Sequence, residues 1–207
     1  MKKTISFLIV ILLCISFCVF SNACNGISGS DNKNDKPEKP SIDTLELSEY
    51  VKLGDYKGLT VTETEYDDRH RGDAIWDVVF ENSEIIAYPE GLAEYYEEQE
   101  KEQYRRMAYS NMSYEDILEF FNTSEEEIAK NSKRRAKEDL VIAAIAKAEG
   151  IVLTEENIDQ LFDSYVAKYA EIGYTEEYVR ANLYDEIIDT MLFDKTIEFL
   201  IINNHFE

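Results

Sequence analysis

The pattern of apolar and polar positions divides the chain into parts with different periods. Residues 5–20 are almost all apolar, whereas residues 25–41 are polar and rich in Gly, Ser, Asn and Pro. Residues 46–61 alternate loosely around glycine turn signals, which predicts a short strand, a turn and a second short strand. From about residue 73 onward apolar positions recur at helical spacing. We therefore expect a mainly α-helical fold that is preceded by one short extended segment.

Local end signals divide the helical part into six expected helices. Ser113 with Asp116, and Thr123 with Glu126, have the spacing of N-terminal capping boxes. Gly150 is typical of the residue that follows a helix end. The fifth helix is expected to pack through Ile158, Leu161, Phe162, Tyr165 and Val166. The expected helices cover residues 73–83, 89–110, 112–122, 123–149, 154–172 and 175–203.

The N-terminus has the pattern of a targeting segment. Residues 1–23 combine two lysines, the apolar run and small residues before Cys24, which predicts a secretory signal peptide. Cys24 at the cleavage point resembles the acylated cysteine of bacterial lipoproteins, and plain secretion is the alternative. Residues 24–45 are then expected to be a flexible tether, because so polar a segment cannot bury enough apolar surface to fold. We expect an extracytoplasmic protein, anchored to the bacterial cell membrane through Cys24 or secreted as a soluble chain.

The charge balance limits the possible partners. The chain has 21 Lys and Arg against 43 Asp and Glu, a net charge of −22, so it would repel nucleic acid backbones. His70 and His205 are its only histidines, and all three cysteines lie within the first 24 residues. We therefore expect no metal site, no cofactor and no catalytic residues. One basic cluster, expected to pair with neighbouring acids or else to contact a partner, comprises Lys133, Arg134, Arg135 and Lys137.

Three stretches in the right order resemble trigger factor, the bacterial ribosome-associated chaperone. "YVKLGDYKGLTV" (50–61) resembles the strand before its prolyl isomerase domain. "AIWDVVFENSEIIAYPEGLAEYYEE" (74–98) resembles the helix, Tyr-Pro linker and helix that open its C-terminal domain. "LVIAAIAKAEGIVLTEENIDQLFDSYVAKY" (140–169) resembles its long helix, turn and next helix. The resemblance implies a helical chaperone domain with projecting arms, similar in fold to the periplasmic chaperone SurA.

The chain also departs from that family. Nothing in it resembles the ribosome-docking loop, so we expect no ribosome contact. Only residues 62–73 stand where the family carries its isomerase domain, and twelve polar residues cannot build that pocket. We therefore divide the chain into an extended segment and truncated linker (46–73) and a helical chaperone domain (74–207). We expect residues 51–61 to lie against the first helix, around a buried Trp76, without pairing into a sheet.

The resemblance implies that amphipathic helices bind unfolded clients through apolar contacts. We expect an ATP-independent chaperone for unfolded or nascent exported proteins, without isomerase activity. An assembly lipoprotein with one dedicated partner, or a true prolyl isomerase, are the alternatives. The sequence leaves open which apolar residues are core and which contact clients. The candidate client-binding residues are Tyr95, Tyr96, Tyr104, Met107, Phe120, Phe121, Tyr165 and Tyr169.

Overall fold

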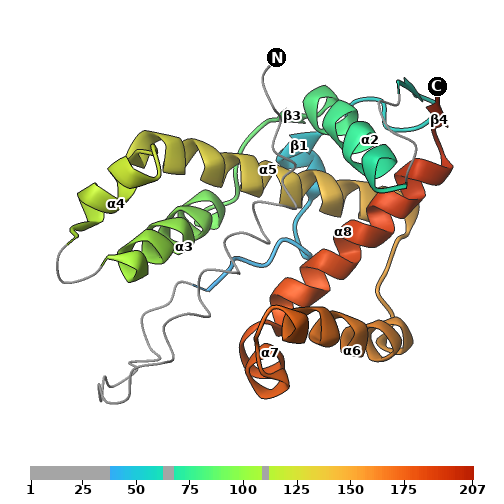
Figure 1. Cartoon of the computed structure of the whole chain (residues 1–207). Helices are drawn as coiled ribbons and strands as arrows, with labels where there is room; N and C mark the ends of the chain where they lie inside the picture. The colour runs from blue at the N-terminus through green and yellow to red at the C-terminus, as the bar shows by residue number, and fades with distance from the viewer. Residues whose placement is uncertain (1–37, 63–67, 109–111) are drawn as a thin grey trace.

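The computed structural model describes residues 38–62, 68–108 and 112–207 (Figure 1). The described part is mainly helical, as predicted, with seven α-helices and a few two-residue strands. The signal peptide and Cys24 lie outside the described residues. The elements are η2 (Leu47–Glu49), β1 (Val51–Lys52), β2 (Thr60–Val61), α2 (Asp68–Asn82), β3 (Glu84–Ile85), α3 (Leu92–Met107), α4 (Tyr114–Phe120), α5 (Glu125–Glu149), α6 (Glu155–Glu171), α7 (Glu176–Asn182), α8 (Tyr184–Ile202) and β4 (His205–Phe206).

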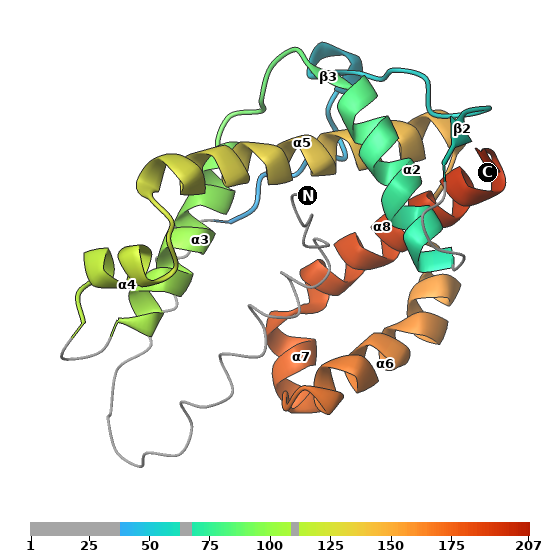
Figure 2. The same ribbon diagram turned by 45° about the horizontal axis from the view of Figure 1, so that its top comes forward.

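A central body forms where α2, the second half of α5 and the second half of α8 pack together (Figure 2). β1 and η2 lie against α5, and β2 lies against α2. Trp76 is buried here, as predicted, with its ring 5.4 Å from Phe193 and 5.8 Å from Phe80. The buried residues of this core are Leu47, Val51, Val61, Ile75, Trp76, Val79, Phe80, Leu92, Tyr96, Ala136, Leu140, Val141, Ile142, Ile145 and Leu200.

Two arms leave this body (Figures 1 and 2). We call α3, α4 and the first half of α5 the first arm, in which α3 packs along α5 and α4 packs on α3. We call α6, α7 and the first half of α8 the second arm, which has its own small core. α4 and α7 lie at the ends farthest from the body. The buried residues of the second arm are Phe162, Val166, Val179, Ile187 and Met191.

The extended stretch 50–61 does pair into sheets, so the expectation that it would not is wrong. Val51 and Lys52 of β1 pair antiparallel with β3, while Thr60 and Val61 of β2 pair parallel with β4 at the C-terminus. The two strands therefore pair with different partners and form no hairpin with each other. Val51 and Val61 both enter the core that contains Trp76. The expected packing against the first helix is correct for β2, which contacts α2, but β1 packs mainly against α5.

Asn204 holds β2 and the preceding loop against the end of α8. Its Oδ1 accepts a hydrogen bond from the Leu59 amide at 2.8 Å. Its Nδ2 donates to the carbonyls of Tyr56 at 3.0 Å and Leu200 at 2.7 Å. Because the Asn204 side chain is buried, it replaces water for three backbone groups that would otherwise lose their partners.

The helix ends follow local signals in part. Ser113 forms the predicted capping box with Asp116, and Gly150 has the left-handed conformation (φ 67°) expected of a helix C-terminus. The predicted Thr123 cap is wrong by one residue. Ser124 accepts from the Glu127 amide instead, because the Thr123 amide is already bonded to the Leu118 carbonyl at the end of α4.

Three further boundaries differ from the prediction. α2 begins at Asp68, so part of the expected linker is helical. α3 begins at Leu92 rather than at the proline, after Gly91 with φ 79°. The expected last helix divides at Leu183 into α7 and α8. This division allows Val179 of α7 and Ile187 of α8 to share the core of the second arm.

The last part of the predicted tether is packed against the protein. Ile42 and Leu45 lie against the main core, and Lys39 is only 23% exposed in its side chain. The packed chain thus begins before residue 46, where we had placed the end of the tether. In the described ranges, no helix has the length and apolar content needed to cross a membrane.

Candidate functional site

The end of the first arm presents an aromatic pair to solvent. Phe120 is 74% exposed and Phe121 is 42% exposed, with ring centroids 5.2 Å apart. The seven-residue α4 buries Ile117 and Leu118 through its inner face, whereas Phe120 and Phe121 follow Glu119 at the end of the helix and stay exposed. Tyr104 on α3 continues the group, with its ring 5.7 Å from that of Phe121. We call Tyr104, Phe120 and Phe121 the aromatic tip.

The second arm also exposes large apolar side chains. Tyr178 and Tyr184 are each 46% exposed, and Leu161 is 40% exposed. Leu161 and Phe162 were both expected to pack into the core, but only Phe162 is buried. The stripe of Val179 and Ile187 faces inward, so Tyr178 and Tyr184 lie off that stripe. Our candidate client-binding residues did not include Tyr178 and Tyr184. The sequence signal for their exposure was their position beside the apolar stripe of the last expected helix.

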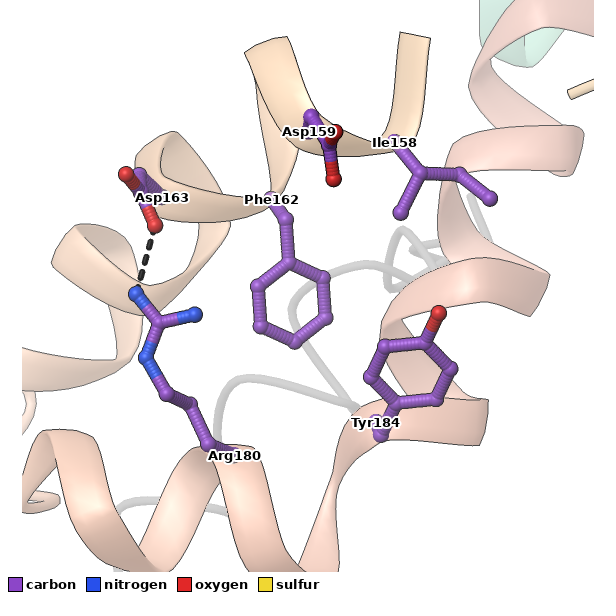
Figure 3. Close-up of a pocket in the computed structure, with 6 residues that line it drawn as sticks. All are labelled: Ile158, Asp159, Phe162, Asp163, Arg180 and Tyr184. Atoms are coloured by element: carbon purple, nitrogen blue, oxygen red, sulfur yellow. Dashed lines mark hydrogen bonds and ion pairs between the residues drawn. The ribbon is translucent and has the colours of Figure 1, made fainter. Parts of the chain in front are cut away.

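A pocket with a volume of 390 Å³ lies beside these residues (Figure 3). The Phe162 ring stands in its centre, 5.1 Å from the Tyr184 ring. The Arg180 guanidinium lies 5.4 Å from the same ring and pairs with Asp163 at 2.5 Å. Because Phe162 is buried, the accessible aromatic surface of the pocket comes from Tyr184, with Arg180 and Asp163 at its border. This combination suits a side chain with an apolar body and a polar end. Its lining residues are Ile158, Asp159, Phe162, Asp163, Arg180 and Tyr184.

The roots of the two arms meet near an aromatic and ionic cluster. Tyr96 is buried, and its hydroxyl donates a short hydrogen bond to Asp139 of α5. The Tyr95 ring is half-buried and lies edge-on to it at 5.2 Å. Burial raises the pKa of both tyrosines, and neighbouring carboxylates add to the effect. Both groups therefore stay neutral hydrogen-bonding phenols at any physiological pH.

The basic cluster of α5 is used mainly inside the fold. Arg134 and Lys137 lie over the Phe80 ring, at 5.5 Å and 4.2 Å from its centroid. Arg135 lies 4.9 Å from the Tyr96 ring, and Arg134 also pairs with Glu138, as its spacing predicted. These cation–π contacts join α5 to α2 and α3, so they stabilise the root of the first arm.

The sequence comparisons give the family. Residues 61–202 match the family model described as the bacterial trigger factor C-terminus. The chain belongs to this family. The trigger factor of Halothermothrix orenii is 34% identical over 150 residues, which cover 65% of this chain and 34% of that protein. The trigger factor of Streptococcus mutans is 29% identical over 142 residues, covering 66% and 33%. No solved structure matches the chain.

The chain spans about a third of the length of the trigger factors it matches. Its match begins at β2 and ends with α8, so it includes both arms and most of the body. Membership of the trigger factor C-terminal family supports a chaperone-like role for this chain.

The eight candidate client residues of this trigger factor domain have different environments. Phe120 and Phe121 are exposed at the first arm. Tyr96 is buried and its hydroxyl is bonded to Asp139 of α5, so a client cannot reach its side chain in the folded chain. Tyr165 donates to Asp194 at 2.5 Å, so its polar end is tied to α8. The half-buried members are Tyr95, Tyr104, Met107, Tyr165 and Tyr169.

Within residues 38–62, 68–108 and 112–207, no three His, Cys, Asp or Glu side chains gather in a way that could hold a metal ion. The exposed candidate residues offer noncovalent contact through aromatic and aliphatic side chains.

Proposed function

We propose that the chain is an extracytoplasmic, ATP-independent chaperone that binds unfolded or newly exported polypeptides. The observation that carries this proposal is the exposure of large apolar side chains near the outer ends of both arms, at Phe120 and Phe121 on one and at Tyr178 and Tyr184 on the other. Soluble proteins rarely leave grouped aromatic side chains in water unless the side chains bind something. Unfolded chains display apolar segments that such side chains can cover.

The arrangement favours many weak contacts over one tight pocket. The aromatic tip and the pocket around Phe162 belong to different arms, so an extended client can touch both at once. Two linked weak contacts raise the effective affinity without a specific sequence in the client. The net charge of −22 would keep the complex with an apolar client in solution.

We also propose that the chain lacks isomerase activity. Only residues 62–67 separate β2 from α2, in the place where the resemblance put an isomerase domain. A packed domain needs far more chain than six residues to bury a core. The extracytoplasmic location and the lipid anchor are supported by the sequence of residues 1–24, which has the pattern of a signal peptide followed by Cys24.

The test uses the chain from residue 25 onward, which retains all described contacts because these fall within residues 38–207. The client is reduced lysozyme diluted from guanidinium, and its aggregation is followed by light scattering. A Phe120→Ala/Phe121→Ala double variant removes the exposed pair. The matched control is Ile202→Ala, which removes another side chain that is 72% exposed, but at the body end of α8.

We expect near-stoichiometric suppression of aggregation by the parent chain and by the Ile202→Ala control. The double Phe variant should bind the client about 30-fold more weakly or worse, since covering each of the two exposed aromatic rings contributes about 1–2 kcal/mol. Absence of suppression with several unfolded clients would contradict the chaperone proposal. One stoichiometric partner recovered from envelope extracts, with no general client binding, would favour the dedicated assembly role.

A further inference from the structure

Residues 38–45 lie between the roots of the two arms, and we call this segment the strap. Figure 1 shows it in blue, passing between α3 and α8. Pro40 lies beside Gly91 at the start of α3, so close that a methyl group on Gly91 would stand 3.4 Å from the proline ring. Ile42 and Leu45 pack against the main core. The strap therefore covers part of the surface where the arms join.

Lys39 connects α5 to α8 through one ammonium group. Its Nζ lies 2.9 Å from Oδ2 of Asp139 on α5 and 2.6 Å from Oδ2 of Asp189 on α8. The same group lies 5.7 Å from the Tyr96 ring of α3. Burial alone would lower the pKa of Lys39, but the carboxylates outweigh it and raise the pKa, so the ammonium persists.

The strap has few other attachments. It forms no helix or strand, and a backbone hydrogen bond from the Leu45 amide to the Ile42 carbonyl, at 3.1 Å, closes its turn. At its end, Lys147 donates to the Leu45 carbonyl at 3.1 Å. Its other side chains, Glu38, Ser41, Asp43 and Thr44, are exposed. Because these attachments are few and the strap belongs to no helix, the strap can leave its place while the helical body stays folded.

We propose that the strap is a built-in competitor of clients: it occupies the junction of the arms, and a bound client displaces it. This inference rests on the proposed chaperone function. Lys39 binds the two carboxylates, and Ile42 and Leu45 pack against the core. A short stretch of an unfolded client with one basic and two apolar side chains could make the same contacts. The chain thus protects this surface from water until a client arrives.

The first measurement asks whether the strap leaves its place. A carbodiimide joins a lysine and a carboxylate that are in direct contact, and mass spectrometry then identifies the linked peptides. In the chain from residue 25 onward we expect links from Lys39 to Asp139 and to Asp189. Saturation with reduced, carboxymethylated lysozyme, a permanently unfolded protein, should lower their yield at least threefold. The link between Lys57 and Glu149, which lie 2.6 Å apart on the body, should keep its yield.

The second measurement asks whether the strap competes. Lys39→Gln should bind fluorescently labelled, carboxymethylated lysozyme three- to tenfold more tightly than the parent. Lys39→Arg should restore the parent affinity, because it keeps the charge. Lys52→Gln makes the same charge change at an exposed position of β1 and should leave the affinity unchanged. Circular dichroism checks that each variant keeps the parent helix content and unfolding midpoint.

The outcomes separate this inference from the proposed function. If Lys39→Gln binds the client no more tightly than a parent that clearly binds it, the strap is not a competitor of clients. The chaperone role stays intact in that case. Persistence of the Lys39 links in the saturated complex overturns the competitor role as well. Failure of both the parent and Lys39→Gln to bind any unfolded protein overturns the chaperone role, and the competitor role with it.

Discussion

Glu138 on α5 is predicted to reduce the stability of the fold as the pH rises. Its side chain is only 13% exposed, and within the described residues no hydrogen bond reaches its Oε1, although Nε of Arg134 stands 3.6 Å away. Burial raises the pKa of Glu138 to about 7, with the nearby charges of Asp139 and Asp77 adding to the effect and two arginines opposing it. The folded chain therefore holds a proton on Glu138 at pH values where the unfolded chain has lost it.

The sign and the magnitude follow from proton linkage. Between pH 4.5 and about 7 the folded state binds more protons at Glu138 than the unfolded state, so the unfolding free energy falls as the pH rises. A tenfold change in proton affinity is about 1.4 kcal/mol, so the full loss is about 3 kcal/mol above pH 7. Glu138→Gln keeps the shape of the side chain and removes the titration. The variant should be more stable than the parent, by less than about 1 kcal/mol at pH 5 and by about 3 kcal/mol at pH 8.

Urea unfolding followed by circular dichroism at pH 5, 6, 7 and 8 measures this difference. The control is Glu198→Gln, which makes the same substitution at an exposed glutamate of α8. A stability difference between Glu138→Gln and the parent that does not grow with pH would refute the reasoning. So would a Gln variant that is less stable than the parent at pH 8.

Two further predictions concern the ends of the chain. Asn204→Ala removes three hydrogen bonds and should lower the unfolding free energy by about 3 kcal/mol, measured in urea. Asn203→Ala, at an exposed neighbour with one side-chain bond, should cost less than about 1 kcal/mol, and an equal loss in both variants would contradict the account of Asn204. Cells that express the full chain should incorporate labelled fatty acid into it, and Cys24→Ser should abolish the label; a labelled Cys24→Ser protein would remove the proposed anchor site.

Many of the helix ends could be predicted from the sequence because capping is local. Ser113 bonds to an amide three residues away, and so does Thr154, whose hydroxyl accepts from Asn157. Such contacts depend on a few neighbouring residues, so their signals lie within one short stretch of sequence. The Thr123 prediction failed because the end of the preceding helix had already taken the Thr123 amide, which the capping pattern alone does not contain.

The candidate site was predicted less well, because helical periodicity does not distinguish an inward stripe from its neighbours. Leu161 and Phe162 are both apolar, yet the turn of α6 buries Phe162 and exposes Leu161. Tyr96 was a candidate client-binding residue, but its place at the root of the first arm puts it under α5 and beside Lys39. Whether a residue is exposed depends on which other helix packs against its face of the helix. That packing helix comes from a distant part of the chain.

The sequence by itself determined the helical character, the acidic surface and the positions of several helix caps, since these depend on composition and on neighbours within four residues. Only the tertiary structure decided the partners of the extended stretch, where Val51 lies opposite Ile85 and Val61 lies opposite Phe206. The same holds for Lys39, which meets a carboxylate 150 positions later in the chain. A two-residue strand or a single ammonium group leaves no periodic pattern in the sequence. Their partners come close only because the packing of the helices brings distant segments together.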